Sequence, residues 1–162
     1  MIRRSFAKAA LGVLGALALG WIPHATAVQG NASCQYGVAS GMWDLPEPSS
    51  AGVVQGQLFD ASGQVVYYFV GKLIETPSPC LSCREGDLIG TLDDGFGPCC
   101  DYEVRGTWIV NQFTGKGSFK ANILLPAGPA LVPKGRMAGL VNDPPSSPNQ
   151  PGSFKARWGI CP

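Results

Sequence analysis

Four cysteines lie within the 21-residue stretch CLSCREGDLIGTLDDGFGPCC, which runs from Cys80 to Cys100. Thiols at this density can bind zinc or an iron–sulfur cluster, form a redox-active pair, or form structural disulfides. The adjacent Cys99 and Cys100 are awkwardly spaced as metal ligands, and a redox-active C-x-x-C usually opens a helix beside a βαβ unit, of which the sequence shows no sign. We therefore predict structural disulfides, with neither a metal site nor a cofactor.

The N-terminus indicates a compartment in which disulfides persist. Residues 1–27 have the pattern of an export signal, with the basic Arg3 and Arg4, the apolar run AALGVLGALALGWI and the cleavage motif ATA. The segment RRSFAK also resembles a twin-arginine signal, which leaves the twin-arginine and general secretory routes open. We expect a protein exported to the periplasm or the extracellular space, in which residues 28–162 form a single domain without a transmembrane segment.

The expected mature domain contains all six cysteines and no histidine, because His24 is the single histidine of the chain and precedes the cleavage motif. An even number of cysteines in an exported protein favours disulfides. The lack of histidine excludes Ser/His and Cys/His mechanisms and histidine metal ligands. An enzyme would have to use carboxylates, such as those of Asp93, Asp94, Asp101 and Glu103, although aspartates at strand ends are equally common as turn caps.

An internal repeat of about 49 residues predicts the elements that position these side chains. The segments GVASGMW, GDLIGTL and GRMAGLV belong to a set of eight seven-residue units, which begin at residues 37, 52, 67, 86, 102, 117, 135 and 152. The third residues are Ala39, Val54, Phe69, Leu88, Val104, Phe119, Met137 and Phe154, and the seventh are Trp43, Leu58, Leu73, Leu92, Trp108, Ile123, Val141 and Trp158. All are apolar, and residues two apart share one face of a strand, so we predict eight half-buried β-strands.

Short connections such as DASG and NQFTGK suit antiparallel neighbours. The most economical arrangement is an all-β, eight-stranded antiparallel up-and-down barrel, because closure removes exposed strand edges. A two-sheet β-sandwich and an open stack of hairpins are the alternatives. The strands GMW and GTW resemble the G-x-W strands of avidin-like and lipocalin-like barrels, and YEVRGTWIVNQFTGKGSF resembles a hairpin repeat of the MORN type. Both resemblances imply an antiparallel meander and assign no site residue.

A meander places alternate connections at opposite ends of the barrel, which restricts how the cysteines can pair. Cys80 and Cys83 fall at one end, here called the upper end, and Cys34, Cys99, Cys100 and Cys161 fall at the lower end. The strand between the two groups is about seven residues long at roughly 3.3 Å per residue, beyond the reach of a disulfide. We predict a Cys80–Cys83 bridge and, below, Cys34 and Cys161 paired with Cys99 and Cys100, with a direct Cys34–Cys161 bridge as the alternative.

The fifth residue of every unit is Gly or Ala, and this ring of small residues has two interpretations. Small residues let coiled strands bend and let aromatic rings lie over the backbone. Alternatively, the ring leaves an apolar chamber for a small apolar or aromatic ligand. The residues that would bind this ligand are Trp43, Phe69, Trp108, Phe119, Phe154 and Trp158.

A near-zero net charge conceals a strong asymmetry between the two halves of the chain. Residues 28–103 contain ten acidic and two basic residues, a net charge of −8, whereas residues 104–162 contain seven basic and one acidic residue, a net charge of +6. The outward positions of the last four strands include Arg105, Lys120, Arg136, Lys155 and Arg157, and those of the first four include Val38, Met42, Val53, Val70 and Ile89. A basic wall of this kind suits a polyanion or an acidic protein partner, and the apolar wall suits another subunit.

The sequence therefore predicts a secreted, non-enzymatic binding module whose first candidate ligand is a small apolar or aromatic molecule inside the barrel. The alternative is a structural or interaction protein of the cell envelope, or an inhibitor, that binds a macromolecule through its outer wall. No feature of the sequence indicates specific recognition of nucleic acid, and oligomers are compatible with the apolar wall.

Overall fold

The computed structural model describes residues 33–46, 49, 51–98, 100–142 and 151–162. The export signal predicted for residues 1–27 lies outside this part of the chain. Within the described residues, we find no helix with the length and hydropathy needed to cross a membrane.

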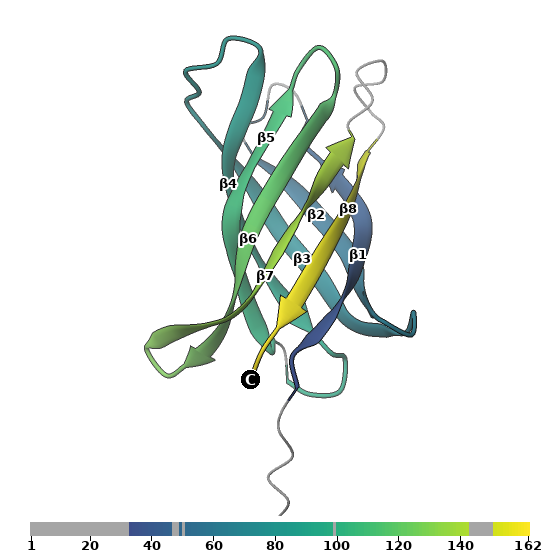
Figure 1. Ribbon diagram of the computed structural model, residues 1–162. Coiled ribbons are helices and arrows are strands. Elements are labelled where there is room, and N and C mark those ends of the chain that lie inside the picture. Colours follow the sequence, from purple (N-terminus) through teal and green to yellow (C-terminus); the bar gives the residue numbers. More distant parts are fainter. Residues whose placement is uncertain (1–32, 47–48, 50, 99, 143–150) are drawn as a thin grey trace, which may run out of the picture. The chain divides into compact units, whose positions relative to one another are not determined.

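The chain forms a closed barrel of eight antiparallel strands in sequence order, which confirms the predicted fold class (Figure 1). The strands are β1 (Gln35–Asp44), β2 (Ala51–Asp60), β3 (Val65–Thr76), β4 (Cys83–Asp93), β5 (Tyr102–Asn111), β6 (Lys116–Ala127), β7 (Ala130–Asn142) and β8 (Gly152–Ile160). The β1–β8 pairing, from Gln35 opposite Ile160 to Trp43 opposite Gly152, closes the seam. Closure leaves no sheet edge unpaired, which is the physical advantage of this arrangement over a sandwich.

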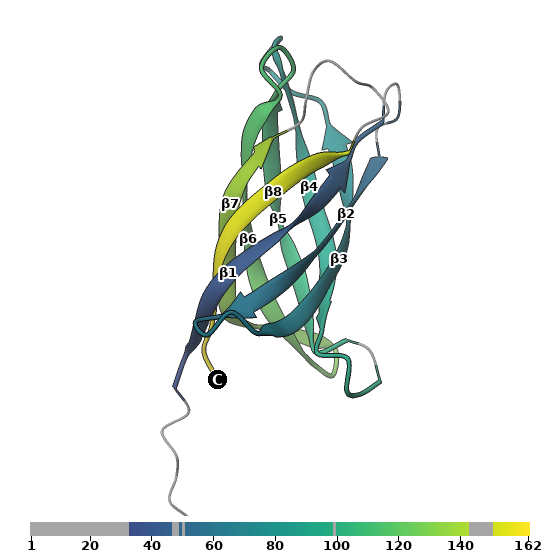
Figure 2. The ribbon, with the colours of Figure 1, turned by 90° about the vertical axis from the view of Figure 1, so that its right-hand side faces the viewer.

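The strands are tilted around the barrel, and their connections alternate between its two ends (Figure 2). The β2–β3, β4–β5 and β6–β7 connections and the C-terminus lie at the lower end of Figure 1, and the β3–β4 and β5–β6 connections lie at the upper end. Register shifts occur in the β2–β3 pair at Leu58/Phe59 and in the β6–β7 pair at Ile123/Leu124. Such irregularities bend strands locally and help a sheet to close.

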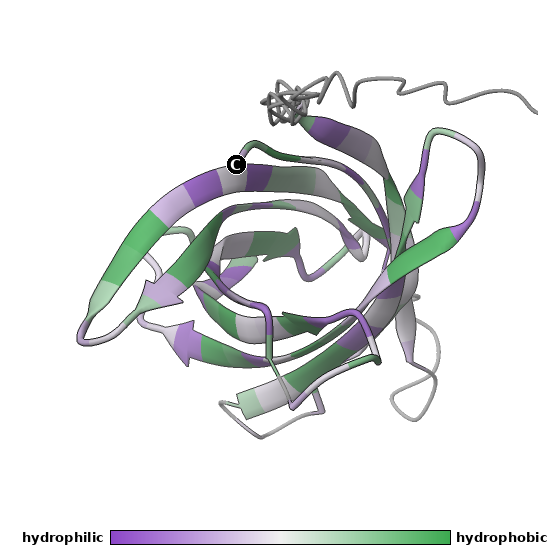
Figure 3. Ribbon diagram, turned by 90° about the horizontal axis from the view of Figure 1, so that it is seen from below, coloured by the Kyte–Doolittle hydropathy of each residue, from purple (hydrophilic) through white to green (hydrophobic). Residues whose placement is uncertain are grey.

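All sixteen third and seventh residues of the predicted units are buried, with exposed fractions of 7% or less. They form the core together with Val110, Ala121, Ala156 and Ile160. No polar or charged residue of the described chain is buried. Viewed along the barrel, green and purple bands follow one another along the strands, as expected for side chains that alternate between an apolar interior and solvent (Figure 3).

Each tryptophan of the barrel lies directly across the sheet from a glycine. Trp43 pairs with Gly152, Trp108 with Gly86 and Trp158 with Gly37. A Cβ atom at Gly37 would lie 2.9 Å from Nε1 of Trp158, and one at Gly152 would collide with the indole of Trp43. Gly37 and Gly152 therefore make room for large rings that lie over the neighbouring strand, whereas a Cβ atom at Gly86 would collide with the backbone of Ile74.

The disulfides confirm one part of the predicted pairing and correct another. Cys80 is bridged to Cys83 at the upper end, as predicted. Cys34 is bridged directly to Cys161, so the preferred pairing of these two residues with Cys99 and Cys100 is wrong and the alternative is right. Cys34 precedes β1 and Cys161 follows β8, so the bridge continues the β1–β8 ladder. Cys100 is also disulfide-bonded, and Cys99 lies outside the described residues.

Candidate functional site: the interior and the outer wall of the barrel

The aromatic residues predicted to bind a ligand are all buried, and five of them pack together. Trp43 meets Trp108 edge to face, with ring centroids 5.9 Å apart. Below this pair, Phe154 makes edge contacts with Phe69 at 6.3 Å and with Phe119 at 5.7 Å. These five rings line an internal cavity of only about 10 Å³. A space of this size holds at most one water molecule, so the rings fill the chamber that they were expected to surround.

The sixth predicted residue, Trp158, lies apart from this cluster. Its ring contacts Tyr67 at 6.0 Å, and Tyr67 contacts Tyr102 at 5.8 Å. Burial raises the pKa of Tyr67 to about 12, and the neighbouring Tyr102 adds to the shift. Neither tyrosine has a role predicted from the sequence, although a signal is present: both occupy first positions of units, where the other six units have glycine.

The indole nitrogens of the three buried tryptophans differ in their hydrogen bonding. Nε1 of Trp108 donates to the carbonyl of Asp87 at 3.1 Å, and Nε1 of Trp158 donates to the carbonyls of Val38 at 3.2 Å and Phe59 at 3.1 Å. Nε1 of Trp43 is buried without a partner in the described part of the chain. An unpaired buried donor costs on the order of 1–3 kcal/mol, which the packing of the Trp43 ring must offset.

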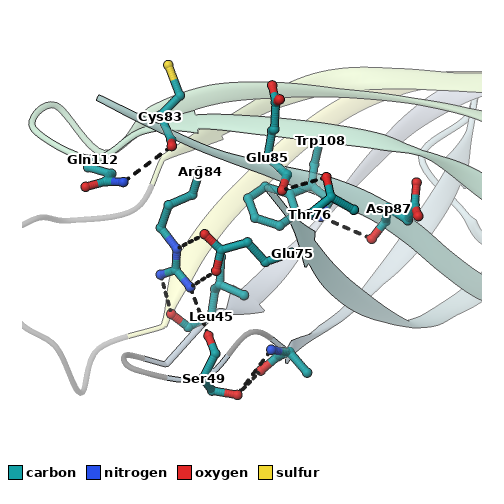
Figure 4. Close-up of polar contacts among 11 residues, drawn as sticks. Leu45, Ser49, Glu75, Thr76, Cys83, Arg84, Glu85, Asp87, Trp108 and Gln112 are labelled. Atoms are coloured by element: carbon teal, nitrogen blue, oxygen red, sulfur yellow. Dashed lines mark hydrogen bonds and ion pairs between the residues drawn. The ribbon is translucent and has the colours of Figure 1, made fainter. Parts of the chain in front are cut away.

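A polar clamp ties the upper ends of β3 and β4 to the β1–β2 connection (Figure 4). The Arg84 guanidinium forms a two-pronged ion pair with the Glu75 carboxylate, with Nε 3.1 Å from Oε1 and Nη2 2.8 Å from Oε2. It also donates to the carbonyls of Leu45 at 3.2 Å and Ser49 at 3.1 Å in the β1–β2 connection. The Leu45 side chain packs against the core. The clamp therefore holds this connection against the upper end of the filled interior.

The acidic residues near the second cysteine pair act as turn caps. The carboxylates of Asp93, Asp94 and Asp101 lie within 4.8 Å of one another. Asp101 Oδ2 accepts a hydrogen bond from the Asp94 N–H at 2.8 Å, and Asp93 Oδ1 accepts one from the Gly95 N–H at 2.7 Å. Asp94 Oδ1 accepts one from the Phe96 N–H at 2.8 Å. These bonds order the β4–β5 connection, which supports the turn-capping interpretation of the sequence.

The predicted basic residues lie on adjacent strands of the outer surface. We define the basic wall as Lys120 on β6, Arg136 on β7, and Lys155 and Arg157 on β8, all of which are exposed. Ala138 on β7 faces Lys120 on one side and Arg157 on the other. Strands β6, β7 and β8 contain no aspartate or glutamate. Within the described chain, none of the four cations of the basic wall forms an ion pair.

Arg105, the fifth predicted cation, differs from the other four. Its Nη2 lies 2.9 Å from Oε2 of Glu103 on the same strand, and its Nε donates to the same oxygen at 3.1 Å. This partner offsets much of the positive charge at the β5 edge. The basic wall therefore extends across β6–β8 and weakens at β5.

Two grooves cross the basic wall and share Leu140 and Lys155 as lining residues. One groove of about 570 Å³ runs from Val38 and Ser40 on β1 across to Ala138 and Gly139 on β7. The other, of about 460 Å³, lies between Lys116 on β6 and Ser153 on β8. Both are open to solvent and contain an apolar floor beside cationic side chains. An extended chain could lie in them with its charged groups against the cations.

The outward residues of β1–β3 form a contrasting apolar wall. Its members are exposed by 40–61% and comprise Val38, Met42, Val53, Val65, Tyr68, Val70 and Ile74. Polar residues interrupt this surface: Asp44 and Lys72 pair with Val53 from either side, and Gln55 pairs with both Met42 and Val70. The exposed apolar side chains of the apolar wall are therefore separated by polar ones and do not form one contiguous patch.

The fold and these surfaces stand without support from relatives. The small up-and-down barrel agrees with the architecture that the G-x-W strands imply. Comparisons of the chain with protein-family models, with curated proteins and with solved structures found no match.

Proposed function

We propose that this protein is an exported interaction module that binds a linear polyanion, such as a sulfated or phosphorylated polysaccharide, along the basic wall. The observation that carries the proposal is the four exposed, unpaired cations on three adjacent strands that contain no acidic residue. The two grooves beside Lys155 supply a path for an extended chain.

The spacing of the cations suits repeated anionic groups. Neighbouring strands lie about 4.8 Å apart, so Lys120 and Arg157, on either side of Ala138, are separated by roughly 10 Å at the backbone. Arginine can engage a sulfate, phosphate or carboxylate with two parallel hydrogen bonds, whereas lysine acts as a point charge. Binding to exposed cations releases counterions from the polyanion, and the affinity should therefore fall steeply with salt.

A small apolar ligand inside the barrel stays a prediction with less support. The unpaired Nε1 of Trp43 would give such a ligand one hydrogen-bond donor. However, the cavity of about 10 Å³ offers no space for it, and the clamp of Arg84 holds Leu45 and Ser49 at the upper end. Binding there would require several core rings to move at once.

Heparin affinity chromatography with a salt gradient tests the proposal. We expect the wild-type protein to be retained and the triple variant K120A/K155A/R157A to elute at clearly lower salt, with the slope of log affinity against log salt reduced by about one for each lost contact. The matched controls are K72A, which removes one cation from the apolar wall, and K120R/K155R/R157K, which keeps all three charges. Elution of the triple alanine variant with the wild-type protein would refute the proposal, as would passage of the wild-type protein through the column at low salt.

A further inference from the structure

The hairpin formed by β6 and β7 extends beyond the barrel. Strand β5 pairs with β6 only as far as Leu124, and β8 pairs with β7 only from Gly135 onward. Beyond these points, residues 125–127 and 130–133 pair only with each other. They form a two-stranded ribbon that turns outward at the lower left of Figure 1. We call residues 124–133 the ribbon.

No residue of the ribbon has a polar side chain, and its sequence is LLPAGPALVP. Cross-strand partners share a face, so both faces are apolar: one has Leu124, Pro126, Leu131 and Pro133, and the other has Leu125, Ala127, Ala130 and Val132. All eight side chains are half-buried or exposed. An antiparallel sheet with a solvated face usually carries polar side chains on that face. A ribbon that is apolar on both faces therefore suits apolar surroundings on both sides.

The prolines of the ribbon restrict what can cover it. The pair Ala127–Ala130 closes a two-residue turn and is hydrogen-bonded, and such pairs alternate with open ones along the hairpin. Beyond the barrel, the backbone positions that face outward are therefore Pro126, Leu131 and Pro133. Proline has no N–H, so of these three only Leu131 offers a donor. An added β-strand needs a row of donors and acceptors along the edge that it joins, which argues against strand addition by a peptide or by a second copy.

The base of the ribbon is anchored to the barrel and is basic. The Lys134 carbonyl accepts a hydrogen bond from the Cys161 N–H at 2.7 Å, and Cys161 is bridged to Cys34. The cations of Lys134 and Arg136 follow the ribbon on β7, and neither forms an ion pair with a described residue. The acidic cluster at the β4–β5 connection lies at the same end of the barrel. The lower end as a whole is therefore not cationic, and the apolar ribbon has to carry any binding there.

We propose that the ribbon inserts into the interfacial region of a phospholipid bilayer, with Lys134 and Arg136 beside the lipid phosphates. A bilayer surrounds an inserted segment on both faces, whereas a protein groove covers one. The small number of outward donors lowers the cost of removing the ribbon from water. Five residues per strand at about 3.3 Å each give a length of roughly 15 Å. This length passes the headgroup region but does not cross the hydrocarbon core of about 30 Å, so the ribbon holds the protein at the membrane surface.

Co-sedimentation of the full exported protein with phosphatidylcholine vesicles tests the proposal. We expect the wild-type protein to bind, with an affinity that changes less than about twofold between about 0.1 and about 0.5 M salt, because apolar contacts are not screened. The variant A127E/A130K should bind roughly tenfold more weakly or less. It keeps the net charge, and its opposite charges face each other across the hairpin, which suits strand pairing.

The matched control is L81S/F113S, which removes two more exposed apolar side chains, in the connections at the upper end. This variant should bind vesicles as the wild-type protein does. A wild-type protein that does not bind would overturn the proposal, and so would equal effects of the two variants. Loss of binding at the higher salt concentration would also overturn it, since the basic wall and not the ribbon would then hold the vesicle.

A tryptophan at the tip of the ribbon reports insertion directly, because the tryptophans of the barrel are buried. On vesicles, the emission of A127W should shift to shorter wavelength and be quenched by bromine-labelled lipid tails, whereas that of F113W at the upper end should do neither. An A127W emission that is already shifted without vesicles, in a protein that light scattering shows to be dimeric, would assign the ribbon to a second copy and overturn the proposal. A127E/A130K should keep wild-type retention on heparin, so the membrane site and the polyanion site can fail independently.

Discussion

The Cys34–Cys161 bridge should be the strongest single contributor to stability outside the core. It joins residues 127 positions apart and lies beside the β1–β8 seam. In the chain-entropy account, a bridge over a loop of this length restricts the unfolded chain by about 5 kcal/mol, whereas the four-residue loop of Cys80–Cys83 gives only about 2 kcal/mol. For a domain of this size, these values correspond to losses of roughly 15–20 °C and roughly 7 °C in melting temperature.

The prediction is tested by thermal and urea unfolding of C34S/C161S and C80S/C83S, each compared with the wild-type protein under non-reducing conditions. We expect the first variant to lose about 3 kcal/mol more than the second. Its urea slope should also increase, because the unfolded chain is freer to expand. Equal losses of unfolding free energy for the two variants, or a larger loss for C80S/C83S, would refute this reasoning. Such a result would show that strand pairing alone holds the seam and that loop length does not determine how much a disulfide contributes to stability.

Two further substitutions test the packing and the titration of the core. The raised pKa of Tyr67 means that the fold favours its neutral phenol, so the corresponding stability is present below pH 10 and is lost between about pH 10 and 12. Between pH 9 and pH 11.5, the unfolding free energy of the wild-type protein in urea should fall by about 2 kcal/mol more than that of Y67F. Equal losses for the two proteins would contradict burial as the cause of the raised pKa. G106A should destabilise the protein by roughly 2 kcal/mol or more, because a Cβ atom there would collide with the Lys120 carbonyl and Ala121. The control G97A has open space around it and should change the unfolding free energy by less than about 0.5 kcal/mol. A G106A protein as stable as G97A would show that the strands can separate locally at little cost.

The fold could be predicted because the sequence pattern that specifies it, the alternation of apolar and polar residues, is local and periodic. In a half-buried strand, every second residue must be apolar, and this constraint identified sixteen of the twenty hydrophobic residues that the structure buries. The number of strands and the short connections then left few topologies, and closure removes the edges that the alternatives expose. The separation of the cysteines into an upper and a lower group followed from the same alternation of connections.

The details of the site could be predicted less well from the sequence, because they depend on contacts between residues far apart in the chain. Arg84 contacts Leu45, which lies 39 positions away, through a side chain that could equally have pointed to solvent. The direct Cys34–Cys161 bridge was one of two arrangements that the barrel permits, and only the geometry of the seam distinguishes them. The pairing of Arg105 with Glu103 likewise depends on rotamers, which the sequence pattern does not specify.

The ring of glycine and alanine residues shows most clearly where sequence reasoning stops. A small side chain indicates that something else occupies the space beside it, and the pattern alone does not distinguish a ligand from a neighbouring ring. Here the occupants belong to the chain: the ring of Phe154 lies against Gly41 and Gly56, and that of Phe69 lies against Gly90. These packed rings stabilise the fold, and every large aromatic side chain of the core is in edge contact with another ring. Because the filled core leaves space for at most one water molecule, recognition by this barrel is best sought on its outer surface, where the basic wall on β6–β8 has no acidic partner among the described residues.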